Sequence, residues 1–143
     1  MQDSSLSSLS KEQVEKLKFT EYLVDSKVEV LIKNWVKYKE LEGVVANLKQ
    51  GNLTYFKENS ELLEALINDL KQDVPEALNS PSIISRLIAL ETKLYKLESL
   101  VNLSNSTPEI ILSCIKEVLE SFSDLNLQMN KKIERESQKI IKP

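Results

Sequence analysis

The chain has no histidine and only one cysteine. Histidine is the commonest general base and metal ligand, so its absence excludes a His-dependent mechanism. A lone thiol, Cys114, can form neither an internal disulfide nor a zinc cluster of thiolates, and its apolar neighbours Ile111, Ile115 and Val118 predict a core position. Gly-rich phosphate loops and nucleophile elbows are also missing. The sequence therefore predicts no enzyme, no cofactor and no metal site.

Glycine and proline are scarce, with two Gly and four Pro among 143 residues. A sandwich or barrel would need turn residues about every 8 to 12 positions, so both folds are disfavoured. No apolar run approaches the roughly 18 residues of a membrane span. The 19 basic and 22 acidic residues are intermixed and give a net charge of −3, which implies no field for nucleic acid.

The few turn residues divide a helical pattern at three places. Ser80 before Pro81 and Thr107 before Pro108 are helix-start signals, because the hydroxyl caps a free N–H while Pro presets φ. Gly51 suits the left-handed position just past a helix end. Between these points apolar residues recur at three- and four-residue steps. The pattern predicts four helices, at about 11–50, 53–74, 81–103 and 108–141.

The first predicted helix follows Ser10 and Gln13, which fit a capping box, and it contains Gly43, which marks either a close helix contact or a slight bend. Short turns make consecutive helices antiparallel neighbours. We therefore expect an all-α fold, an antiparallel up-down-up-down four-helix bundle with long first and last helices. Residues 11–143 form this single domain, and residues 1–10 form a flexible Ser-rich leader or tether.

Unequal helix lengths predict a thin pole. Both long helices would extend past the turn that joins the two short ones, leaving two helices with apolar stripes there. An uncovered apolar patch marks an interaction site. The candidate interaction residues at this pole are Val14, Leu17, Leu23, Ile133 and Ile140.

A second candidate site is polar. Arg86 lies among aliphatic residues, and counting from the common pole places it at a height similar to Glu29 and Asn126. A guanidinium there would hold a carboxylate or an anionic ligand, although a structural or partly exposed ion pair is the simpler interpretation.

Two further groups are better explained by structure than by chemistry. Four glutamates fall at heptad seam positions, as in di-iron bundles, but those sites need Glu-x-x-His pairs, so we expect these side chains at the seam edge: Glu21, Glu42, Glu91 and Glu98. The aromatic residues are more typical of a core than of a ligand pocket: Trp35, Tyr38, Tyr55, Phe56 and Tyr95.

The middle of the chain resembles an uncharacterised family of small helical bacterial lipoproteins. The resemblance covers Asp73-Val-Pro-Glu-Ala-Leu-Asn-Ser-Pro81, Ser85-Arg-Leu87 and Leu90-Glu-Thr-Lys-Leu-Tyr-Lys-Leu97, with a fainter echo in Phe122–Lys131. It implies a soluble domain in the bacterial cell envelope, on the periplasmic face or lipid-anchored, with the leader as a tether. The lipid-bearing cysteine of that family is missing here, so Met1 would replace native residues upstream.

These observations predict a non-enzymatic helical binding or scaffolding module that meets a protein partner, or a second copy of itself, through the thin pole. Membrane contact is expected only through an N-terminal lipid anchor absent from this chain. Two alternatives stay open at this point. One is a cytoplasmic dimeric adaptor or regulator, and the other is a helical pocket for a small apolar ligand, which requires a cavity behind Trp35 and Tyr95.

Overall fold

The computed structural model describes residues 9–57 and 60–141, with side chains as far as Gln138. Within these residues the protein is all-α, as the sequence predicts, and contains no β-strand. Its helices are α1 (Lys11–Glu15), α2 (Ser26–Ile32), α3 (Val36–Lys49), α4 (Thr54–Lys57), α5 (Ser60–Gln72), the 3-10 turn η1 (Glu76–Leu78), α6 (Pro81–Val101) and α7 (Pro108–Ile141). No helix in the described part of the chain is long and apolar enough to cross a membrane.

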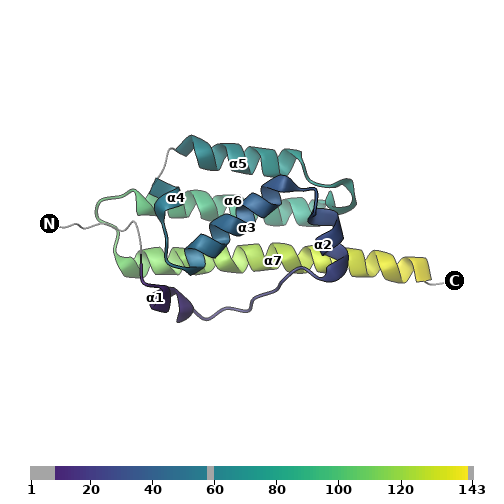
Figure 1. Ribbon diagram of the computed structural model, residues 1–143, viewed down its shortest axis with the longest axis horizontal. Coiled ribbons are helices and arrows are strands. Elements are labelled where there is room, and N and C mark those ends of the chain that lie inside the picture. Colours follow the sequence, from purple (N-terminus) through teal and green to yellow (C-terminus); the bar gives the residue numbers. More distant parts are fainter. Residues whose placement is uncertain (1–8, 58–59, 142–143) are drawn as a thin grey trace.

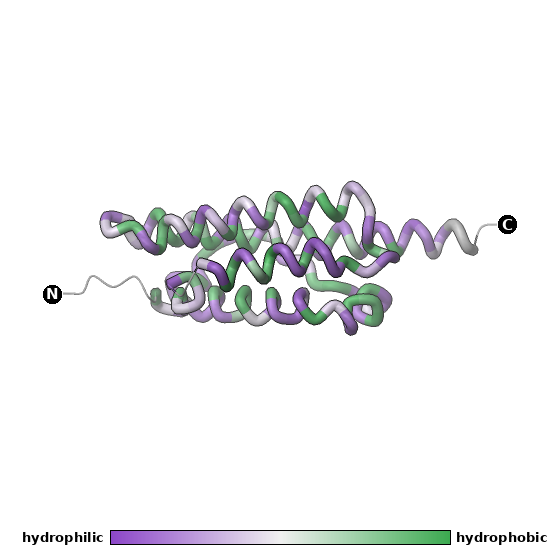
Figure 2. Tube along the Cα trace, turned by 90° about the horizontal axis from the view of Figure 1, so that it is seen from above, coloured by the Kyte–Doolittle hydropathy of each residue, from purple (hydrophilic) through white to green (hydrophobic). Residues whose placement is uncertain are grey.

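Helix α7 is the longest element, and the other helices are arranged along it (Figure 1). Helix α6 packs on α7, while α5 contacts both α3 and α6. Helices α5 and α7 run from the end where the N-terminus lies toward the end where the C-terminus lies, and α6 runs back between them (Figure 1). Hydrophobic and hydrophilic residues alternate along these helices (Figure 2), which gives each an apolar side for the core.

Each helix-start signal is confirmed by its hydrogen bonds. The Ser80 Oγ accepts from the Ile83 N–H at 3.5 Å, and the Thr107 Oγ1 accepts from the Ile110 N–H at 3.2 Å. Both helices begin at the proline that follows. Side-chain acceptors of this kind satisfy N–H groups that have no partner inside the helix. Helix α7 consequently covers the range expected of the fourth helix.

The turn at Gly51 is also confirmed. Gly51 has φ +82°, the left-handed region that glycine enters at no steric cost. A Cβ atom here would lie 2.1 Å from the carbonyl oxygen of Leu9, because the Leu9 N–H donates to the Gly51 carbonyl at 2.7 Å. Gly51 therefore has two roles. It ends α3, and its carbonyl holds Leu9, the first described residue, against the end of that helix. A Cβ atom at Gly43, by contrast, would meet no neighbouring side chain within 4 Å, so Gly43 marks no close contact.

The long first helix predicted over 11–50 is wrong. The capping box of Ser10 and Gln13 forms, but α1 ends at Glu15, and residues 16–25, here called the strap, run along α7 without helical structure (Figure 1). Leu17 and Phe19 are both half-buried, two residues apart, which is the spacing of an extended chain rather than of a helix.

Local sequence explains why the strap is not helical. Phe19, Thr20, Tyr22 and Val24 are aromatic or β-branched residues that favour extended backbone over helix. Asp25 then starts α2 by accepting the Val28 N–H at 3.1 Å. A second break follows at residues 33–35, where α2 ends and α3 begins.

The range of the second predicted helix, 53–74, contains α4 and α5, and residues 58–59 between them lie outside the described part. The 75–80 connector contains the helical turn η1. The third helix ends at Val101, close to the expected 103, where the N–H of Asn102 still donates to the Glu98 carbonyl.

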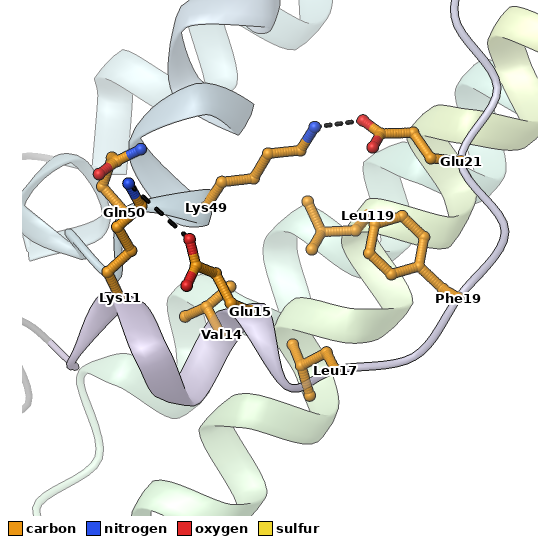
Figure 3. A pocket seen from close by; sticks show the side chains of 9 residues that line it. All are labelled: Lys11, Val14, Glu15, Leu17, Phe19, Glu21, Lys49, Gln50 and Leu119. Carbon is orange, nitrogen blue, oxygen red and sulfur yellow. Dashed lines mark hydrogen bonds and ion pairs between the residues drawn. The ribbon is translucent and has the colours of Figure 1, made fainter.

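The predicted thin pole of two helix ends does not form. Helix α1 lies beside the first half of α7, near Leu119, whereas the free end of α7 points the other way (Figures 1 and 3). Leu119 and Ile133 are fourteen residues apart, or about 21 Å along a helix. The broken first helix is the cause, because the strap turns the chain back along α7 and carries α1 to the opposite end.

Candidate functional site

Three polar side chains of α7 hold the strap by its main chain. Ser123 accepts from the Tyr22 N–H and donates to the Thr20 carbonyl at 3.1 Å. Asn130 accepts from the Asp25 N–H and donates to the Leu23 carbonyl, both at 2.9 Å. These donors and acceptors replace the partners that the strap would have in a sheet. The strap is thus fastened through its backbone, and its Leu23 side chain stays 71% exposed.

Asn126 is the central member of this set. It is 2% exposed, donates to the Tyr22 carbonyl at 3.0 Å and accepts from the Tyr38 hydroxyl at 2.6 Å. Tyr38 stacks on Phe122 of α7, with ring centroids 5.7 Å apart. Burial raises the pKa of Tyr38 well above its ordinary value, so the hydroxyl stays protonated and remains a donor. Asn126 therefore joins the strap, α3 and α7 in one buried contact.

Between the strap and α3 lies a groove made of two clefts. The first cleft has a volume of about 240 Å³. Its apolar side chains Leu17, Phe19 and Leu119 lie together beside the ion pair of Lys49 and Glu21 (Figure 3). The residues that line this first cleft are Lys11, Val14, Glu15, Leu17, Phe19, Glu21, Lys49, Gln50 and Leu119.

The second cleft continues on the other side of the Glu21–Lys49 ion pair, since both residues line both clefts. Its volume is about 430 Å³, and α7 contributes Phe122 and Asn126 to it. The remaining lining residues come from the strap, α2 and α3: Glu21, Leu23, Val24, Glu29, Glu42, Val45, Ala46 and Lys49.

The charged residues that line the second cleft are mostly glutamates, and each of them pairs with a lysine. Three of its four charged lining residues are glutamates, and Lys49 is the fourth. Lys39 pairs with Glu29 at 3.2 Å and with Glu42 at 3.4 Å, and these hydrogen bonds and charges raise the pKa of Lys39. All these side chains reach solvent, so the apolar floor lies below a charged rim.

The groove unites candidate residues that the sequence placed in different sites. Val14 and Leu17 line the first cleft, and Leu23, Glu29 and Asn126 line the second.

Two other candidates, Ile133 and Arg86, are not part of the groove. Ile133 is half-buried farther along α7, and the Ile140 side chain lies outside the described residues. Arg86 is exposed on α6, lines neither cleft and makes no ion pair with a described residue. The candidate polar site of Arg86, Glu29 and Asn126 is therefore not assembled, because Glu29 and Asn126 line the second cleft and Arg86 does not.

The remaining sequence candidates have structural positions. Cys114 is buried, and burial raises the pKa of its thiol to about 11. Trp35, Tyr38 and Phe56 belong to the core, and neither cleft is lined by Trp35 or Tyr95. Among the residues that the structure describes, no group of three His, Cys, Asp or Glu side chains is placed to hold a metal ion.

The sequence analysis did not predict the strap or two of its polar partners, Ser123 and Asn130, and it assigned the third, Asn126, to a different site. One available signal is the row of Ser123, Asn126 and Asn130, which have helical spacing of three and four residues beside the apolar stripe of α7. The other is the Asp25-Ser26 pair, a helix-start signal inside a segment interpreted as continuous helix. A comparison of the chain with protein-family models, with curated proteins and with solved structures found no match. Any function therefore has to be inferred from the groove's own geometry.

Proposed function

We propose that this protein is a non-enzymatic helical binding module that holds apolar side chains of a partner polypeptide in the groove between the strap and α3. The observation that carries the proposal is the pair of open clefts that meet at Glu21 and Lys49. Clefts with an apolar floor and a few polar groups at the rim are the usual form of a binding site.

We infer further that α3, α5, α6 and α7 are the scaffold of the module, as an antiparallel up-down-up-down four-helix bundle. Packing of α3 on α5, of α5 on α6 and of α6 on α7 supports this inference. In such a scaffold only the strap would depend on polar fastening, and the groove would have one rigid wall, α3, and one wall of lower stability.

Selection from a random peptide library on the immobilised protein tests the binding function. Ala46 is exposed and lines the second cleft, so Ala46→Trp is expected to fill that cleft without disturbing the core. Ala65 is exposed on α5 and lines neither cleft, so Ala65→Trp is the matched control. Recovered peptides should bind the wild-type protein and the control but not the Ala46→Trp variant. Recovery of no peptide, or equal binding to both variants, would contradict the proposal.

A small apolar ligand is a second candidate occupant. The volume of the second cleft, about 430 Å³, favours it, because small-molecule pockets typically have about 300–1,000 Å³. A ligand that binds only the native state raises the melting temperature. We expect a rise with a neutral apolar ligand in the wild-type protein that Ala46→Trp abolishes, and an unchanged melting temperature across a lipid and sterol panel would remove this candidate.

An envelope location through an upstream lipid anchor is part of the proposal and rests on the resemblance of residues 73–97. In that arrangement the tether would enter beside Gly51, where Leu9 is seated, rather than at the free end of α7. Mass spectrometry of the mature N-terminus, after fractionation of native cells, tests it. An unmodified chain in the soluble fraction would favour the cytoplasmic adaptor instead.

A further inference from the structure

We propose that the groove recognises an extended peptide with an apolar–basic–apolar pattern of side chains, whose basic residue pairs with Glu21. This inference names the partner chemistry of the proposed binding function and rests on that function. Its basis is the position of Glu21, which lies on the strap, lines both clefts and has apolar lining on either side.

Glu21 already has a cationic partner, which shows the chemistry that the position accepts. Lys49 forms an ion pair with it, and the two side chains are 38% and 42% exposed. Exposed ion pairs contribute only about 0–1 kcal/mol. Lys49 contacts the Oε2 atom of Glu21, so an incoming lysine or arginine can pair with the Oε1 atom of the same carboxylate without displacing Lys49.

The two apolar positions follow from the clefts. Leu17, Phe19 and Leu119 line the first cleft, and Val24, Val45 and Phe122 line the second. Side chains on one face of an extended chain recur at every second residue, about 6.6 Å apart. A peptide with apolar, basic and apolar residues at positions i, i+2 and i+4 presents all three on one face, in the same order as the first cleft, Glu21 and the second cleft.

Three synthetic peptides test this pattern: Leu-Ser-Arg-Ser-Leu, its Leu-Ser-Gln-Ser-Leu counterpart, and Ser-Ser-Arg-Ser-Ser. Each carries the same fluorophore, and binding is followed by anisotropy. We expect the first peptide to bind about two- to fivefold more tightly than the second, the effect of about 0.5–1 kcal/mol for an exposed pair. The third should bind more weakly than the first, and added salt should reduce the advantage of the arginine peptide.

Two single variants of the ion pair sharpen the test. Glu21→Gln and Lys49→Met both abolish the Glu21–Lys49 interaction, so a purely structural effect shifts the affinity in the same direction in both. The proposal predicts opposite shifts. Glu21→Gln should weaken binding of the arginine peptide about two- to fivefold, whereas Lys49→Met should strengthen it, because a competing cation is removed. Circular dichroism and melting temperatures establish that both variants are folded.

The possible outcomes distinguish failure of the apolar–basic–apolar recognition pattern from failure of the proposed binding function. Equal affinity for the arginine and glutamine peptides, or shifts of the same sign in the two variants, would overturn the recognition pattern. The binding function would survive that result if library peptides still discriminate Ala46→Trp from Ala65→Trp. Absence of binding by all three peptides overturns the pattern as well, and only failure of the library selection overturns the function.

Discussion

Helix α6 and the strap are both held on α7, but with different shares of apolar burial and hydrogen bonding. Helix α6 meets α7 through buried aliphatic side chains such as Leu97 and Ile115. The strap contacts α7 through hydrogen bonds between its main chain and Ser123, Asn126 and Asn130, and its apolar side chains Leu17, Phe19 and Val24 are only partly buried against the core. Apolar burial is the dominant stabilising term, whereas a hydrogen bond contributes about 1 kcal/mol net. We therefore expect the α6–α7 hairpin to be the more stable part, and the strap, which forms one wall of the groove, to open first.

The largest effect is expected in the hairpin. Leu97 is fully buried on α6, so Leu97→Ala should lower the free energy of unfolding by about 3 kcal/mol through lost burial and a residual cavity. Urea denaturation measures the change. Ile88 is exposed on the same helix, and Ile88→Ala serves as the control that should cost far less. Equal losses from the two substitutions would refute the view that apolar packing fixes the hairpin.

Removal of the central fastening of the strap should come next. Asn126→Ala leaves the buried Tyr38 hydroxyl and the Tyr22 carbonyl without their partner, at a cost of about 2 kcal/mol. Hydrogen exchange of the Tyr22 and Asp25 amides should accelerate more than exchange in α6, because the strap opens locally.

A double-mutant cycle with Tyr38→Phe isolates the Asn126–Tyr38 interaction. Because that interaction is lost in each single variant, the double variant should be less destabilised than the sum of the singles. Strict additivity, or uniform acceleration of exchange across the chain, would show that the strap has no separate stability.

The two glycines should respond in opposite directions to the same substitution. Gly51→Ala places a Cβ atom at φ +82° and against the Leu9 carbonyl, so we expect a loss of about 1–2 kcal/mol. Gly43 is exposed within α3 with no neighbour nearby, so Gly43→Ala should stabilise by about 0.5–1 kcal/mol. Thermal unfolding of both variants measures the difference, and a gain in stability from Gly51→Ala would rule out the seating of Leu9 on this turn.

The smallest expected effect is a loss of folding stability at low pH. Glu117 of α7 accepts hydrogen bonds from Lys96 and Lys93 of α6. These bonds and the positive charges of the two lysines lower the pKa of its carboxyl below 4.5. A lowered pKa means that the contribution to stability is present above pH 4.5 and is lost as the pH falls through the folded-state pKa. Urea denaturation between about pH 7 and pH 3 should show that loss, with a smaller decline in Glu117→Gln. Parallel pH profiles for both proteins would show that this carboxylate does not stabilise the hairpin.

The parts of the fold that follow local rules were predictable. Ser80-Pro81 and Thr107-Pro108 start their helices, Gly51 ends one, and Ser10 with Gln13 caps another, because each signal acts on backbone groups within a few residues. The strap was not predictable in the same way. Its apolar residues fit a helical spacing of three and four almost as well as an extended spacing of two, and periodicity alone does not separate them.

The candidate site was found only in part for a related reason. Five candidate residues were predicted from their positions in the expected four-helix bundle, and the groove contains all of them in another arrangement: Val14, Leu17, Leu23, Glu29 and Asn126. Lys49 was missed, since nothing in its local sequence indicates a partner twenty-eight positions away at Glu21.

The all-α class, the helix starts and the Gly51 turn depend on short-range sterics and capping, so the amino-acid sequence alone specifies them. The course of residues 9–50 depends instead on contacts made across the fold. The strap becomes stable only when Ser123, Asn126 and Asn130 supply partners for its main chain from more than one hundred positions away. Buried main-chain groups must be paired, and it is that requirement, met between distant segments, that creates the groove.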